Sequence, residues 1–114
     1  CELLAPLEEK GAIRVLKPSE DSTHNAHMLA ISFRSVDEAN QVRKELNQVG
    51  IQAVIHYVPL HSSAMGSRLG YSEDDLPVTM EAANSLIRLP LHHGITDTEL
   101  RYVARELERV VLRD

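Results

Sequence analysis

The feature that most constrains this chain is a candidate strand that is apolar on both of its faces. A period of two divides residues 25–33 between the faces, with His27, Leu29, Ile31 and Phe33 on one and Ala26, Met28, Ala30 and Ser32 on the other. Because both faces are largely apolar, we expect a central strand with other elements packed on each side. The chain should therefore fold as layers, with helices laid on a sheet.

Two capping boxes predict where the main helices begin. Ser35 with Glu38, and Thr96 with Glu99, pair a hydroxyl with a glutamate three residues later. Such pairs satisfy the free N–H groups of a first helical turn. Apolar residues then recur at helical spacing: Val36, Ala39, Val42, Leu46 and Val49 after the first box, and Leu100, Val103, Ala104, Leu107, Val110 and Val111 after the second.

The remaining segments complete an α+β pattern. We expect a helix over residues 3–11, started or kinked by Pro6, and a short helix over 79–86. Strands are expected near 13–16, 51–57 and 87–89, and a long irregular loop over 61–75. The order predicts one domain over residues 1–114, with helices packed on a small, mostly antiparallel or mixed sheet.

Composition excludes several classes of function. The net charge is −5 and the 12 basic residues are scattered, which argues against a nucleic-acid or anionic-membrane surface. No apolar run approaches the roughly 20 residues of a membrane span. The lone Cys1 allows no internal disulfide, and together these features favour the cytoplasm. The chain opens on helical residues without Met or a capping residue, as expected of a piece of a longer protein.

The six histidines are the main candidates for chemistry, although surface or half-buried polar positions would also explain most of them. His56 and His61 are close enough in sequence to bind a metal together with a carboxylate. No cysteine partner or metalloprotease motif supports that reading, so we expect no metal site. There is also no nucleophile elbow and no glycine-rich phosphate loop.

Three stretches, taken together, carry a family resemblance. They are residues 25–28, residues 50–61 with the motif HYVPLH, and residues 76–96 with the motif RLPLHHGIT. In this order and spacing they resemble the C-terminal region of the DegT/DnrJ/EryC1/StrS sugar aminotransferases, over essentially the whole chain. Within that family, residues 25–28 and 56–61 are most similar to the dTDP-4-amino-4,6-dideoxygalactose transaminases.

The resemblance implies a fold-type I enzyme that uses pyridoxal phosphate. Members transfer an amino group, typically from L-glutamate, to the keto carbon of a nucleotide-linked 4-keto-6-deoxysugar, as in lipopolysaccharide and other surface-polysaccharide synthesis. It also implies an N-terminal large domain in the same protein, which carries the Schiff-base lysine, and a homodimer with active sites at the subunit interface. This chain would be the C-terminal small domain.

The positions of the three lysines also indicate that the Schiff-base lysine is not in this chain. Lys10 lies at a predicted helix end, Lys17 precedes a proline, and Lys44 is on the polar side of its helix. A Schiff-base lysine needs a desolvated or cation-flanked position that lowers its pKa. None of the three qualifies, so we expect no transamination by the isolated chain. The resemblance implies that the ring-stacking and phosphate-binding residues also lie in the N-terminal domain, so we expect no catalytic or cofactor-binding residue here.

The strongest site prediction is that His56, Tyr57 and His61 line the substrate pocket. Pro59 restricts both itself and Val58, so the turn between the histidines should be stiff. Imidazole and phenol groups donate or accept hydrogen bonds with sugar and phosphate oxygens. The alternative is that His56 and Tyr57 only finish a buried strand.

His27 is a weaker candidate for the pocket, because a core position would also explain it. Two other functions stay open. The chain could be an independent small-molecule-binding or regulatory domain. It could also be an interaction module that buries Met28 and its leucine faces against a partner.

Overall fold

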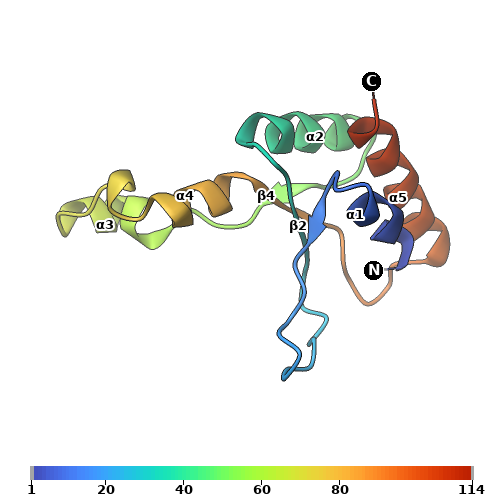
Figure 1. The fold of residues 1–114 in the computed structure, drawn as a ribbon, viewed down its shortest axis with the longest axis horizontal. Helices are drawn as coiled ribbons and strands as arrows, with labels where there is room; N and C mark the ends of the chain where they lie inside the picture. Colours follow the sequence, from blue (N-terminus) through green and yellow to red (C-terminus); the bar gives the residue numbers. More distant parts are fainter. Residues whose placement is uncertain (1, 114) are drawn as a thin grey trace.

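The computed structural model describes residues 2–113, in which four antiparallel strands form one sheet (Figure 1). Their order is β1-β2-β4-β3, with β1 at Arg14–Val15, β2 at Leu29–Ser32, β3 at Val54–Ile55 and β4 at Leu86–Leu89. The last strand in sequence, β4, lies between β2 and β3 and pairs with both. The predicted α+β fold is confirmed, and the sheet among the described residues is fully antiparallel.

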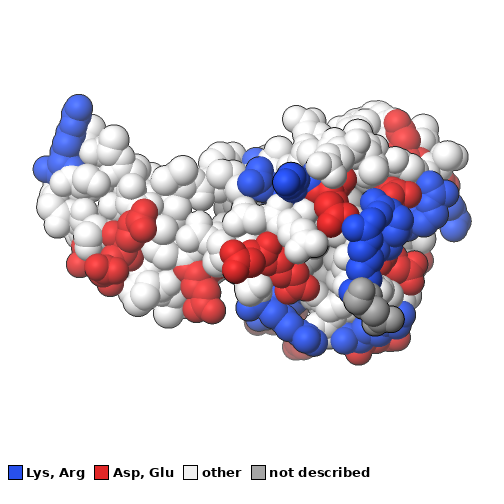
Figure 2. All heavy atoms as spheres, turned by 90° about the horizontal axis from the view of Figure 1, so that it is seen from above, with Lys and Arg blue, Asp and Glu red and all other residues white. Residues whose placement is uncertain are grey.

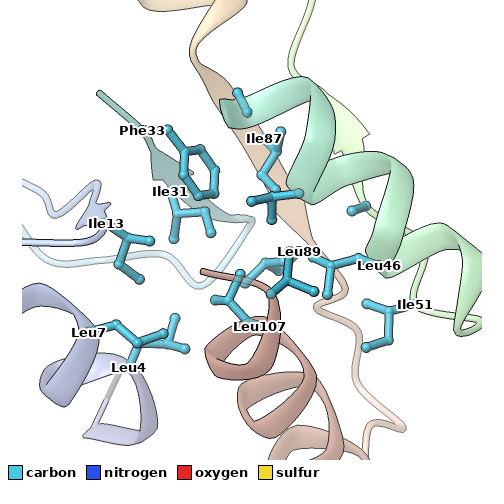
Figure 3. Packing of buried hydrophobic residues seen from close by; sticks show 14 of the residues in the cluster. Leu4, Leu7, Ile13, Ile31, Phe33, Leu46, Ile51, Ile87, Leu89 and Leu107 are labelled. Atoms are coloured by element: carbon cyan, nitrogen blue, oxygen red, sulfur yellow. The ribbon is translucent and has the colours of Figure 1, made fainter. Parts of the chain in front are cut away.

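Helices cover one face of this sheet. They are the 3₁₀ turn η1 (Glu2–Leu4), α1 (Ala5–Glu9), α2 (Val36–Gln48) and α5 (Asp97–Val111). Figure 3 shows Ile31 and Ile87 of the sheet packed with Leu46 of α2 and Leu107 of α5, and all four are at most 1% exposed. We call the sheet and these helices the body. None of the described helices is long and apolar enough to cross a membrane.

Both predicted capping boxes begin helices. The Ser35 hydroxyl accepts a hydrogen bond from the Glu38 N–H at 3.1 Å, while the Glu38 carboxylate accepts from the Arg34 N–H instead of closing the box. The second box closes fully. The Thr96 hydroxyl accepts from the Glu99 N–H at 3.3 Å, and the Glu99 carboxylate accepts from the Thr96 N–H at 2.8 Å.

The central strand is shorter than the sequence predicts. Asn25 accepts a hydrogen bond from the His27 N–H at 3.1 Å, and Ala26 has a φ of 51°, so residues 25–28 form a turn before β2. The physical reason is that an asparagine side chain offers the backbone a partner that competes with strand pairing. Helices α1, α2 and α5 pack only on the face of Ile31, and the other face of β2 carries the small Ala30 and Ser32.

Residues 57–84 extend away from the body, and we call them the arm (Figure 1). The expectation of an irregular loop over 61–75 is wrong, because the arm contains the elements η2 (Leu60–Ser62), α3 (Ala64–Arg68), η3 (Glu73–Asp75) and α4 (Pro77–Asn84). Ser63 caps α3, and Gly70 follows it with a φ of 91°. With the arm extended, the radius of gyration is 15.4 Å, against about 13 Å for a compact domain of this size.

Candidate functional site

The end of β3 presents two of the predicted site residues side by side. The rings of His56 and Tyr57 lie 4.7 Å apart between centroids and are tilted by 60°. Tyr57 is 66% exposed, so the alternative that it finishes a buried strand is wrong. The guanidinium of Arg88, on the adjacent strand β4, lies 5.1 Å from the centroid of the Tyr57 ring. Tyr57 therefore has both an imidazole and a cation as close neighbours.

His61 lies beyond the stiff turn, in a different setting. Pro59 holds extended backbone, with φ −57° and ψ 140°, and η2 begins directly after it. His61 is only 8% exposed, and its Nε2 atom is buried without a hydrogen-bond partner. It borders a groove of about 830 Å³ in the arm, whose other lining residues include Leu60, Met65, Leu69, Tyr71 and Leu76. The groove is largely apolar, and His61 is one of its few polar groups.

A close backbone contact holds this part of the arm together. The N–H of Gly66 donates to the Ser63 hydroxyl at 3.1 Å, which places the first turn of α3 against η2. A Cβ atom at position 66 would overlap the carbonyl oxygens of Leu60 and His61. Gly66 is thus required by packing, and its position fixes the backbone that carries His61.

His27, the weakest of the predicted site residues, lies apart from the others. It is exposed, in the turn before β2, so the expectation that it is a core histidine is wrong. Within residues 2–113, no hydrogen bond or ring contact joins it to His56, Tyr57 or His61. The cause is the Asn25 turn, which takes His27 out of the strand.

Arg88 is a candidate that the sequence reading did not include. It stands between Ile87 and Leu89 in β4, and both of these neighbours are buried in the core. Period-two alternation therefore places Arg88 on the opposite face of the sheet. A charged residue at the centre of an otherwise apolar strand was the signal that could have identified it.

Comparison with known proteins places this chain in a family. The sequence model of the DegT/DnrJ/EryC1/StrS aminotransferase family matches residues 2–108. The chain belongs to this family. Its fold is similar to that of Spr1654 from Streptococcus pneumoniae, a candidate sugar aminotransferase, with 23% identity and a TM-score of 0.82 over 96% of this chain.

Two further solved structures have a similar fold. NtdA from Bacillus subtilis, with bound PMP, has 26% identity and a TM-score of 0.80 over 98% of this chain. PseC from Helicobacter pylori, an aminotransferase of pseudoaminic acid biosynthesis, has 16% identity and a TM-score of 0.82 over 96%. The chain spans 29% of Spr1654, 26% of NtdA and 30% of PseC.

Spr1654 is known in both PLP and PMP forms, so we asked whether this chain could anchor that cofactor. Its lysines do not fit a covalent anchor. Lys10 and Lys44 are exposed, and Lys17 pairs with the Glu8 carboxylate at 2.7 Å, which holds the pKa of Glu8 below its usual value. Within residues 2–113, no three His, Cys, Asp or Glu side chains gather where they could hold a metal ion.

Proposed function

We propose that residues 1–114 are the C-terminal small domain of a PLP-dependent sugar aminotransferase. The match to the aminotransferase family over residues 2–108 carries this proposal, and the similar structures are about three times as long as this chain. In this proposal a large domain supplies the Schiff-base lysine, and the isolated chain does not catalyse transamination.

The reaction we propose is amino transfer from L-glutamate to a nucleotide-linked 4-keto-6-deoxysugar. The HYVPLH motif at residues 56–61 supports a dTDP-4-amino-4,6-dideoxygalactose transaminase in particular. Pyridoxal phosphate supplies the electron sink in such enzymes. The residues of this chain bind and orient the sugar, and the intact enzyme works in the cytoplasm in surface-polysaccharide synthesis.

His56, Tyr57 and His61 are the proposed sugar contacts. His56 Nδ1 and His61 Nε2 are both buried without a partner, and an unmade buried hydrogen bond costs about 1–3 kcal/mol. A sugar hydroxyl, keto or phosphate oxygen would satisfy them, because a neutral imidazole offers one donor and one acceptor. Pro59 keeps the segment in one conformation, which lowers the entropic cost of binding. His27 is left out of this proposed pocket.

The proposed partners of the arm are the large domain and the second subunit of a homodimer. The arm exposes large apolar side chains, with Leu60 at 87%, Val78 at 78% and Leu69 at 69%. Leu60 and Leu69 line the same groove, and a concentration of exposed apolar side chains of this kind usually marks a contact with another protein surface. Covering the arm would also enclose the groove next to His61 and exclude water from it.

The test uses the full-length enzyme with His56→Ala or His61→Ala, and His93→Ala as the exposed control. The glutamate half-reaction and the keto-sugar half-reaction are followed separately by cofactor absorbance. We expect kcat/KM for the keto sugar to fall about three- to tenfold in the first two variants, as for one lost neutral hydrogen bond, with the glutamate half-reaction close to wild type.

Two results would count against the proposal. If both variants handled the sugar like wild type, the 56–61 segment would be structural. If the isolated chain bound a nucleotide sugar that the full-length enzyme did not turn over, an independent binding domain would be the better description.

A further inference from the structure

The structure contains two arginine–tyrosine pairs with nearly the same separation but different surroundings. Arg88 lies 5.1 Å from the Tyr57 ring centroid, and Arg105 lies 5.2 Å from the Tyr102 ring centroid. Arg105 also pairs with the Glu106 carboxylate at 3.4 Å. Within residues 2–113, none of the ion pairs closer than 4.0 Å involves Arg88. One stacked cation has a carboxylate partner and the other has none.

The position of Arg88 explains why residues 2–113 supply no acceptor for its Nε atom. Arg88 is on the inner strand β4, and its cross-strand neighbours are Ala30 of β2 and Val54 of β3. Neither side chain can accept a hydrogen bond. The Nε atom of Arg88 is buried without a partner, whereas the Arg105 side chain is 69% exposed on the surface of α5.

A half-buried guanidinium without an acceptor is a ready site for an anion. Arginine presents its N–H groups as a planar fork that matches two oxygens of a carboxylate or phosphate. Stacking on an aromatic ring fixes the plane of that fork and leaves its edge free. The His56 ring also lies next to Tyr57, and its Nδ1 lacks a hydrogen-bond partner as well.

We propose that Arg88, held in position by Tyr57, binds an oxyanion of the substrate. The chemistry that it recognises is a carboxylate or a phosphate group. Only the source of that group rests on the proposed function: the carboxylate would come from the amino donor, and the phosphate from the diphosphate of the nucleotide sugar. In either case Arg88 aligns a charged end of the ligand with the His56–Tyr57 pair.

The test is a titration of the ¹⁵N-labelled 114-residue chain with glutarate and, separately, with inorganic pyrophosphate, at constant ionic strength set with chloride. We expect a saturable shift of the Arg88 Nε–Hε signal with at least one of the two probes. Arg88→Gln should weaken binding at least about tenfold, as for one lost charge-assisted hydrogen bond. Arg105→Gln is the matched control and should bind within twofold of wild type.

The two probes also distinguish the two possible sources of the oxyanion that Arg88 binds. Tighter binding of glutarate assigns Arg88 to the amino donor, and tighter binding of pyrophosphate assigns it to the nucleotide sugar. Arg88→Lys keeps the charge but loses the fork, so it should bind more weakly than wild type and more tightly than Arg88→Gln. Because the wild-type Arg88 signal is read directly, the first criterion, whether a probe shifts that signal, does not require any variant to fold.

The inference is overturned if neither probe shifts the Arg88 signal, or if Arg105→Gln weakens binding as much as Arg88→Gln. Either outcome can be told apart from a failure of the proposed function, because the titration does not measure transaminase activity. A full-length enzyme without transaminase activity would remove the assigned source of the anion but leave the titration result unchanged.

Discussion

The body and the arm use apolar residues in opposite ways. In the body, the core side chains are at most 8% exposed and pack into one cluster with the sheet. In the arm, which is about a quarter of the chain, lie eight of the fourteen exposed large apolar residues. The body therefore accounts for its own stability, whereas the arm has apolar surface that its own fold does not cover.

The distribution of charged side chains also differs between the body and the arm. Figure 2 shows acidic and basic side chains mixed over the surface of the body, and an arm that is mostly uncharged. Arg68 is the only basic residue between positions 57 and 84. The same range holds four acidic residues, Glu73, Asp74, Asp75 and Glu81, and large exposed apolar groups lie among them. Exposed apolar groups at this density are typical of a surface that meets another surface. The apolar residues of the body therefore stabilise its fold, whereas those of the arm are available to contact another protein surface.

The largest predicted effect is on the free energy of unfolding, and it comes from making the same substitution, leucine to alanine, once in the body and once in the arm. Leu46→Ala removes a fully buried side chain from α2 and should lower the free energy of unfolding by about 2–5 kcal/mol. Leu69→Ala makes the same change at a side chain that is 69% exposed, and should cost less than about 0.5 kcal/mol. Urea denaturation of the two variants measures both values. Equal losses would mean that the arm is part of the core.

A smaller effect should be confined to the arm. Gly66→Ala places a methyl group against the carbonyl oxygens of Leu60 and His61 and should cost about 1–3 kcal/mol of local stability. Hydrogen exchange should then speed up in α3 and η2 while α2 and α5 keep their protection. Gly94→Ala is the control, because the nearest atom would be 3.8 Å away. Faster exchange throughout the body would show that the two regions unfold together.

The elements of the body could be predicted from the sequence because local rules decide them. The capping residues Ser35 and Thr96 and the helical spacing after them located α2 and α5. Alternation put Ile31 on an apolar face of its strand, and the strand expected near residues 87–89 corresponds to β4. These signals depend on neighbours close in sequence, so they can be read without knowing the tertiary structure.

The arm and the site needed the three-dimensional structure. The helical turns of the arm depend on a hydrogen bond to Ser63 and on a backbone contact at Gly66, and both are too local to produce an apolar period. Arg88 and Tyr57 are far apart in sequence, and only the pairing of β3 with β4 brings them together. Strand order is a tertiary property that a linear pattern does not specify. The sequence could mark Arg88 as a charged residue in an apolar strand, but it could not show that Arg88 lies beside Tyr57.

The smallest effect that we predict concerns pH and again distinguishes the body from the arm. Glu8, in α1, accepts hydrogen bonds from Lys17 at 2.7 Å and from the Val15 N–H at 3.0 Å, and these lower its pKa from 4.5. A lowered pKa in the folded state means that the ionised form stabilises the fold. That contribution is complete well above pH 4.5 and is lost as the pH falls through the folded-state pKa.

Glu8→Gln should therefore be less stable than wild type at pH 7, by at most about 1 kcal/mol for a pair near the surface, and the difference should disappear at acid pH. Urea denaturation at several pH values between about 7 and 3 measures it. Glu81→Gln, in α4, removes an arm carboxylate that takes part in none of the ion pairs among the described residues. Because it breaks no such contact in the body, it should keep the wild-type dependence of stability on pH. If Glu8→Gln instead kept the wild-type dependence, the link between β1 and α1 through Glu8 would contribute nothing to the stability of the body.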